Sequence, residues 1–121
     1  MLHEGRLFFT TVNGKLVIVN PSSLAIEEIV DLTQMHEPDT LLGWCRGVWL
    51  DGDKAWVGFS HIRPTRLREN VAWVMRGFRN VLPTRIACYD LARRRCVAAI
   101  DLQSHGLNAV FSIFPGYEQD L

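Results

Sequence analysis

The stretch Leu16-Val-Ile-Val-Asn-Pro21 decides the fold, because its pattern returns later in the chain as Ile86-Ala-Cys-Tyr-Asp-Leu91. A short apolar segment that ends in Asp-Leu follows each copy, at Asp31-Leu32 and at Asp101-Leu102, and the same interval separates these two dipeptides. A repeated β unit of this size cannot bury its faces alone. The sequence therefore predicts an array of stacked β units, such as a propeller or a solenoid.

The repeat extends to the strands on either side of this stretch. Upstream, Arg6-Leu-Phe-Phe-Thr-Thr corresponds to Lys54-Ala-Trp-Val-Gly-Phe59. Fewer residues separate these two segments than separate the two copies of the quoted stretch. This difference indicates an insertion in the second copy, which we place at residues 61–83. In addition, Cys45-Arg-Gly-Val48 matches Leu107-Asn-Ala-Val110.

These correspondences predict an all-β chain made of short strands. Runs of aromatic and β-branched residues favour strands, and Asn13-Gly14 is a hairpin signal because both positions tolerate positive φ. We expect strands at residues 6–12, 15–20, 26–32, 45–50, 54–60, 84–91, 96–102 and 107–114. With the four strands of a unit labelled A to D from the inside out, the chain reads B-C-D, A-B-C-D, A. Two four-stranded units' worth of strands thus form a single domain over residues 1–121.

The insertion carries a helical pattern. Apolar residues recur there at steps of three and four, which marks one face of a short helix. They are Leu67, Val71, Val74, Met75 and Phe78. We expect this helix either to pack on the second unit or to serve as an oligomer contact or a lid.

With its strands placed, the chain resembles two consecutive blades of a β-propeller of the YVTN/NHL-like kind over residues 5–114. The two copies of the quoted stretch, each followed by a strand that ends in Asp-Leu, carry this resemblance. The chain also resembles the C-terminal part of uncharacterised bacterial propeller proteins with a Ser-x-Ile-Arg-Pro-Thr stretch, here Ser60-His-Ile-Arg-Pro-Thr65. The Trp-Asp and Gly-His signatures of WD40 repeats are absent from the sequence. The resemblance implies a fold and no particular activity, because propellers host unrelated functions.

A propeller usually closes with four to eight blades, so two blades leave sheet edges open. Either this chain belongs to a longer protein, or several copies close a ring. The strand order favours the ring, because a strand at residues 107–114 can pair with the B-C-D strands of a neighbouring copy. We therefore expect a homo-oligomer, with three copies and six blades preferred and four copies and eight blades as the alternative.

Composition excludes some partners and indicates a compartment. Thirteen acidic residues balance thirteen basic ones, which gives no general attraction to nucleic acid or to an anionic membrane. No apolar run approaches the length of a membrane span, and no basic leader with an apolar run begins the sequence. Three cysteines without metal-type spacing (Cys45, Cys88 and Cys96) favour buried thiols in a reducing compartment, so we expect a cytoplasmic protein.

Candidate ligand-binding residues are those expected at the mouth of the central channel. They are Arg46, Asn108, His105, His61 and Arg63. Arginine forks match planar oxyanions, so such a mouth suits a phosphate, a carboxylate or a sugar. Each of these residues also has a structural alternative, such as capping neighbouring carbonyl groups. The histidines lack metal-ligand spacing, and we predict neither a metal nor a cofactor.

Catalysis is poorly supported by these residues. The sequence contains no Gly-x-Ser-x-Gly elbow and no glycine-rich phosphate loop. The expected inner strands carry no carboxylate of the kind that lactonase-like propellers use to hold a metal. We therefore expect a non-enzymatic propeller unit that assembles into a ring and binds a small anion, a glycan or a protein partner. The alternatives are a purely structural assembly unit and an enzyme of the lactonase or lyase kind.

Overall fold

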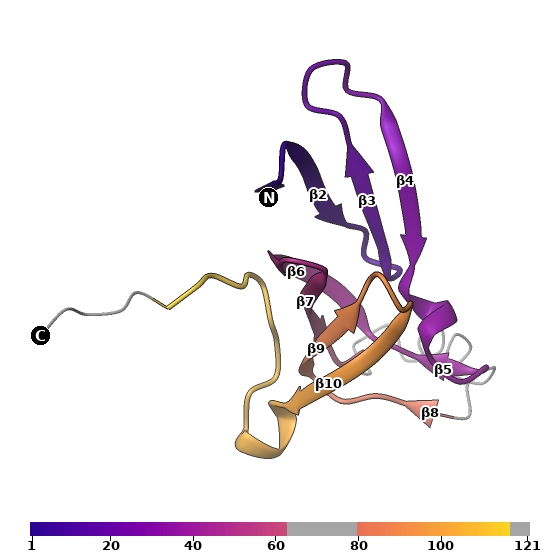
Figure 1. Cartoon of the computed structure of the whole chain (residues 1–121). Helices are drawn as coiled ribbons and strands as arrows, with labels where there is room; N and C mark the ends of the chain where they lie inside the picture. Colours follow the sequence, from indigo (N-terminus) through magenta and orange to yellow (C-terminus); the bar gives the residue numbers. More distant parts are fainter. Residues whose placement is uncertain (63–79, 117–121) are drawn as a thin grey trace, which may run out of the picture.

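The computed structural model describes residues 1–62 and 80–116 and is mainly β, without a helix of seven or more residues in those ranges. Most strands form two four-stranded antiparallel sheets, one from the first part of the chain and one from the second, and neither sheet is closed (Figure 1). The first sheet contains β1 (Leu2–His3), β2 (Arg6–Thr10), β3 (Lys15–Val19) and β4 (Ile26–Asp31). The second contains β6 (Trp44–Asp51), β7 (Lys54–Ser60), β9 (Arg85–Asp90) and β10 (Arg95–Asp101).

Four smaller elements lie outside these two sheets. A short parallel pair joins β5 (Thr40–Leu41) to β8 (Asn80–Val81). Single 3₁₀ turns, η1 (Leu32–Met35) and η2 (Gln103–His105), follow the last strand of each sheet. The helix expected in the insertion lies outside the described residues.

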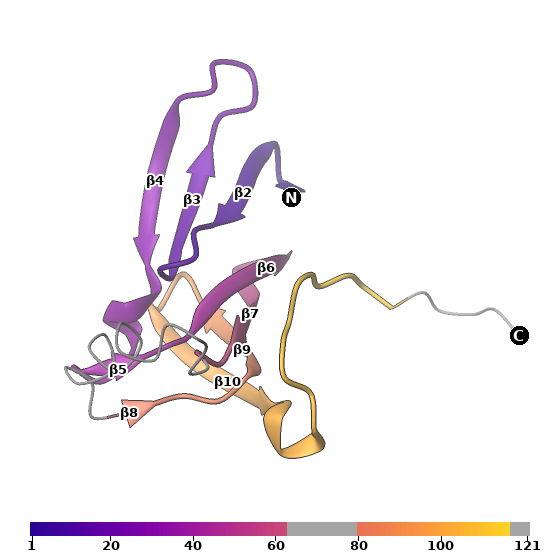
Figure 2. The same cartoon turned by 180° about the vertical axis from the view of Figure 1, so that it is seen from behind.

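Seven of the eight predicted strands are confirmed, as β2, β3, β4, β6, β7, β9 and β10. Residues 107–114 are the exception, because the structure assigns no strand there. A β-strand needs a hydrogen-bonded neighbour. In the described chain no strand is hydrogen-bonded to this segment, which lies outside both sheets (Figure 2). We call residues 107–116 the tail.

The two sheets repeat one strand register. Leu7 lies opposite Val19 in the first sheet, and the equivalent residues Ala55 and Tyr89 lie opposite each other in the second. The central strands of both sheets therefore pair in the same frame, residue for residue. Since a slip of one residue would turn every side chain to the other face, the shared register shows that the sequence repeat is a structural repeat.

Irregular positions repeat as well. A β-bulge leaves Glu27 of β4 unpaired, and the corresponding bulge in β10 leaves the equivalent residue Val97 unpaired. The turn before each of these strands contains a residue with positive φ, Leu24 at 58° and Arg94 at 56°. Non-glycine residues rarely adopt this conformation, so its recurrence at equivalent positions marks a common turn.

The short strand β1 was not predicted, and the repeat explains it. Leu2 lies opposite Leu7, and its equivalent Leu50, near the end of β6, lies opposite Ala55. β1 therefore occupies the position that the end of β6 has in the second sheet. In the first sheet this position holds the two residues of β1, whereas β6 has eight.

The hydrophobic core lies between the two sheets, which pack through one face each. This packing keeps apolar side chains from water, which is the main favourable term in folding. The core side chains include Phe8, Leu16, Ile18 and Val30 from the first sheet and Ala55, Val57, Phe59, Ala87 and Tyr89 from the second. Gly58 lies between the core residues Val57 and Phe59, so it belongs to the opposite face of the second sheet.

Candidate functional site

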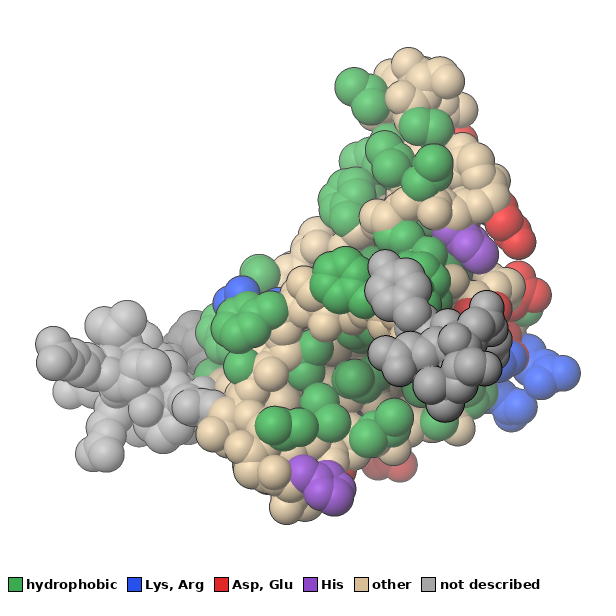
Figure 3. Space-filling view, turned by 90° about the vertical axis from the view of Figure 1, so that its left-hand side faces the viewer, with side chains coloured by type: hydrophobic (Ala, Val, Ile, Leu, Met, Phe, Trp, Pro, Cys, Tyr) green, Lys and Arg blue, Asp and Glu red, His purple; other side chains and the backbone are tan. Residues whose placement is uncertain are grey.

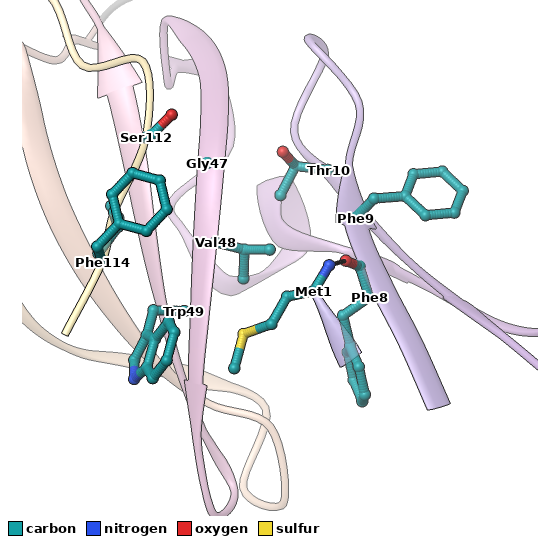
Figure 4. A pocket seen from close by; sticks show the side chains of 10 residues that line it. Met1, Phe8, Phe9, Thr10, Gly47, Val48, Trp49, Ser112 and Phe114 are labelled. Carbon is teal, nitrogen blue, oxygen red and sulfur yellow. Dashed lines mark hydrogen bonds between the residues drawn. The ribbon is translucent and has the colours of Figure 1, made fainter. Parts of the chain in front are cut away.

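An open groove lies between the first sheet, β6 and the tail, and we call it the inner groove. It has a volume of about 480 Å³ and is lined by residues 8–10, 47–49 and 112–114 with Met1. Figure 4 shows β6 between β2 on one side and the tail on the other. The thioether of Met1 reaches the backbone of β6, where its sulfur accepts a hydrogen bond from Leu50 N at 3.2 Å. Most of the lining is apolar.

We call the face of each sheet that points away from the core its outer face. The tail crosses the outer face of the second sheet and is held there by Val110. Ser60 Oγ accepts a hydrogen bond from Val110 N at 2.9 Å and donates one to Val110 O at 3.2 Å. The Val110 side chain fills the space above Gly58, where an added Cβ would lie 2.3 Å from Val110 Cγ1. Glycine at position 58 is therefore required for this contact.

A second glycine lets the tail pass β6. Gly47 has φ 71° and sits at a β-bulge between Arg46 and Val48. A Cβ on Gly47 would lie 3.1 Å from Ser112 Cα, so the absence of a side chain permits close approach of the two backbones.

The tail crosses the second sheet as β6 crosses the first. Gly58 is the repeat equivalent of Thr10, and Val110 is the equivalent of Val48. Val48 and Thr10 line the inner groove together, as Figure 4 shows. At the edge of each sheet a further hydrogen bond recurs, from Leu32 N to Gly14 O at 2.9 Å and from the equivalent Leu102 N to Thr84 O at 3.0 Å. The tail therefore occupies, over the second sheet, the place that β6 occupies over the first.

Arg46, the leading ligand-binding candidate, is exposed on β6, and its guanidinium carbon lies 5.4 Å from the centre of the Phe111 ring. This is the distance of a cation–π contact. Phe111 itself is 71% exposed. Arg46 thus links β6 to the tail, and its ligand-binding role stays a prediction.

Two other candidates meet at Thr84, at the start of the tail's path. The buried Thr84 Oγ1 accepts a hydrogen bond from His61 N at 2.9 Å and donates one to Asn108 O at 3.0 Å. The His61 ring faces Leu82 O, 3.1 Å from its Nδ1. His105 is exposed at the end of η2, and Arg63 lies outside the described residues. The contacts at Thr84 are structural, and the binding roles stay predictions.

A buried polar cluster, missed by the sequence analysis, lies between the sheets. Arg85 is 4% exposed, and its Nη1 donates to Leu42 O at 2.7 Å and to Pro83 O at 3.2 Å. Its guanidinium lies 4.4 Å from the centre of the Phe59 ring. Burial lowers the pKa of Arg85. A basic residue within a strand gives no sign in the sequence that it is buried.

His36 and Tyr89 complete this cluster. His36 Nε2 lies 2.7 Å from the hydroxyl group of Tyr89, and desolvation together with nearby Arg85 lowers the pKa of His36. Burial raises the pKa of Tyr89, and it raises the pKa of the neighbouring Cys45 thiol to about 11. The side chains of His36, Tyr89 and Cys45 are therefore neutral at ordinary pH, which suits an interior position.

The described residues contain no group of three metal-ligating side chains, and none of their helices could span a membrane. Cys88 and Cys96 lie on the neighbouring strands β9 and β10, and both are free thiols. Comparisons with protein-family models, curated proteins and solved structures find no match for this chain.

Proposed function

We propose that this chain is a non-enzymatic β-propeller unit that works by assembly with protein partners through its inner edge. In this reading the first sheet is a blade whose inner position holds the two residues of β1, the second sheet is a complete blade, and the tail is the inner strand of a third. The tail would recruit the remaining strands of that third blade from a partner.

One observation carries the proposal: the tail lies over the second sheet as β6 lies over the first. Val110 sits on Gly58, and the equivalent residues Val48 and Thr10 line one groove. β6 has a strand partner, β7, whereas the tail has no strand partner among the described residues. A segment placed as an inner strand but lacking its neighbour is a template for strand addition.

The chemistry of the surroundings also favours a protein partner. Leu107, Phe111 and Phe114 of the tail are 52%, 71% and 79% exposed. Exposed aromatic side chains of this kind, grouped on one segment, mark protein interaction sites more often than sites of catalysis.

A small anion or a glycan bound near Arg46 is the second candidate. It is favoured by the fact that, within the described ranges, Arg46 forms no ion pair with a carboxylate. An exposed guanidinium without an acidic partner has its donors available for an oxyanion.

A tandem fusion tests the assembly proposal. By the repeat, residues 111–113 of the tail correspond to residues 49–51 of β6 and to residues 1–3. Joining Ile113 of one copy directly to Glu4 of a second copy should therefore complete the third blade within one chain. The matched control is the same fusion with residues 107–113 replaced by a Gly/Ser sequence of equal length.

We expect the fusion to melt at a higher temperature than the control, because the added strand pairs and buries apolar surface. We also expect its tail amides to be protected from hydrogen exchange. Equal melting temperatures, together with unprotected amides at residues 107–113, would contradict the proposed function.

A further inference from the structure

We infer that the partner is a second copy of this chain, whose β2 pairs antiparallel with the tail of the first copy. This inference rests on the proposed function and names the partner that completes the third blade. Its basis is that the chain carries both halves of the required interface, the tail at one end and the edge of β2 at the other.

The β6–β7 pair within the chain supplies the template for this contact. Val48 lies opposite Val57 in that pair. By the repeat, Val110 of the tail is equivalent to Val48, and Phe9 of β2 is equivalent to Val57. The docked strands should therefore place Val110 opposite Phe9 of the second copy, in a cross-strand pair of two apolar side chains.

The edge of β2 is open where this pair would form. β1 lies opposite only Arg6 and Leu7, and Met1 adds backbone hydrogen bonds to Phe8. In the described part of the chain no strand lies beside Phe9 on this edge, and its side chain is 47% exposed. An edge of this kind can pair with another strand.

The outer faces of the two sheets also match each other. The outer face of the second sheet carries Trp56, Ile86, Cys88 and Ile100. By the repeat, these positions are equivalent to Phe8, Leu16, Ile18 and Val30, which form the core surface of the first sheet. Conversely, Phe9 on the outer face of the first sheet is equivalent to the core residue Val57.

Docking of a second copy would therefore repeat the packing that already joins the two sheets. The outer faces that docking would bury expose apolar side chains, since Phe9, Ile29 and Ile100 are 47%, 53% and 50% exposed. Figure 3 shows one face of the molecule, over which hydrophobic side chains are spread from top to bottom. The contact is head to tail, so repeating it either closes a ring or extends a chain.

Docking requires β1 to move, at a modest cost. Residues 111–113 of the arriving tail take the places of residues 1–3 in the repeat. The strand that leaves is two residues long, and Met1 is held by backbone hydrogen bonds with Phe8 of 2.7 and 2.8 Å. The tail can replace these bonds with equivalent ones, so the exchange conserves hydrogen bonding while adding apolar burial.

Disulfide cross-linking between separate copies tests this register. One preparation carries Val110→Cys, and a second, isotopically labelled, carries Phe9→Cys; the two are mixed and oxidised. As a matched control, the Val110→Cys protein is mixed with a Ser23→Cys protein, whose cysteine lies in the exposed turn between β3 and β4. Peptide mapping distinguishes the engineered bond from any bond to native cysteines.

We expect a disulfide between position 110 of one copy and position 9 of the other, and none between positions 110 and 23. Absence of the 110–9 disulfide in folded, mixed protein would overturn the inference, as would equal yields in the control. If the tandem fusion is nevertheless stabilised, the blade-completion role stands and the partner is another protein. If the fusion also gains nothing, both conclusions fail.

Discussion

Val110 packs directly onto Gly58, so closely that a methyl group on residue 58 would lie 2.3 Å from Val110 Cγ1. We predict that Gly58→Ala displaces the tail from the second sheet. An added Cβ would also meet Arg46 O at 2.7 Å, so the free energy of unfolding should fall by about 1–3 kcal/mol, as in other overpacked sites.

Limited proteolysis between residues 106 and 116 and a chemical unfolding curve measure the two effects of Gly58→Ala. Gly116→Ala is the matched control, because no heavy atom lies within 4 Å of a Cβ placed there. If the tail of the Gly58→Ala protein is as resistant as that of the Gly116→Ala protein, Val110 does not anchor it.

The three thiols should differ in reactivity. Burial raises the pKa of Cys45 to about 11, and Cys45 and Cys88 are buried whereas Cys96 is half-buried. Since the thiolate is the reactive form, we predict that iodoacetamide at a pH of about 8 modifies Cys96 first and Cys45 last. Mass spectrometry of the modified peptides gives the order. Modification of Cys45 at the rate of Cys96 would show that the core between the sheets is open.

Asp90 should make stability depend on pH at the acidic end. Its carboxylate accepts hydrogen bonds from Arg93 N and Lys54 Nζ, both at 3.0 Å, and these lower its pKa below the usual 3.8. The carboxylate therefore contributes stability that is fully present above about pH 3.8 and is lost as the pH falls through the lower folded pKa.

We predict that Asp90→Asn lowers the melting temperature at neutral pH and that the difference from the native chain shrinks in acid. An asparagine can still accept the Arg93 N bond, as the equivalent Asn20 does for Ser23 N at 3.2 Å, so the turn is retained. A double-mutant cycle with Lys54→Met isolates the ion pair. A difference that stays constant with pH would mean that the charge of Asp90 is not involved.

His36 should make the stability of the fold depend on pH in a second range, nearer neutrality. Desolvation and nearby Arg85 lower the pKa of His36 below 6.5, so the unfolded chain takes up the proton first. The contribution of neutral His36 to stability is therefore fully present above about pH 6.5, and it declines as the pH falls toward the pKa of His36 in the folded chain.

We predict that His36→Gln lowers the melting temperature at neutral pH. The variant should also lose most of the fall in melting temperature that the native chain shows between about pH 7 and about pH 5. The neutral amide still reaches toward the Tyr89 hydroxyl, which the imidazole contacts at 2.7 Å. Melting curves across this range measure the effect. An unchanged slope in the variant would assign the decline to other groups.

Much of the sheet structure was predictable from the sequence, because alternating apolar residues and Asn-Gly or Asp-Gly turns specify hairpins over short distances. The constant interval from the quoted stretch to its Asp-Leu dipeptide is matched in the structure, where Val17 lies opposite Ile29 and the equivalent Ala87 lies opposite Ala99. Other elements lack such signals. β1 is too short to show a period, and the β5–β8 pair joins segments far apart in the sequence through only two residues each.

The tail illustrates a different limit. Residues 107–114 have the composition of a strand, yet the structure leaves them unpaired, because pairing depends on a neighbour that the described chain does not supply. The contact between Arg46 and Phe111 was likewise beyond the sequence, since exposed arginines carry no signal for the ring they stack on. Buried Arg85 was missed for the opposite reason, because its charge suggested an exposed position.

The mass of the chain in solution tests the central claim most directly. Sedimentation velocity over a range of concentrations should give a species at a multiple of 13.8 kDa, with three copies preferred, and a chain ending at Gly106 should lose it. A native chain that remains a soluble 13.8 kDa monomer at every concentration would contradict assembly with a second copy.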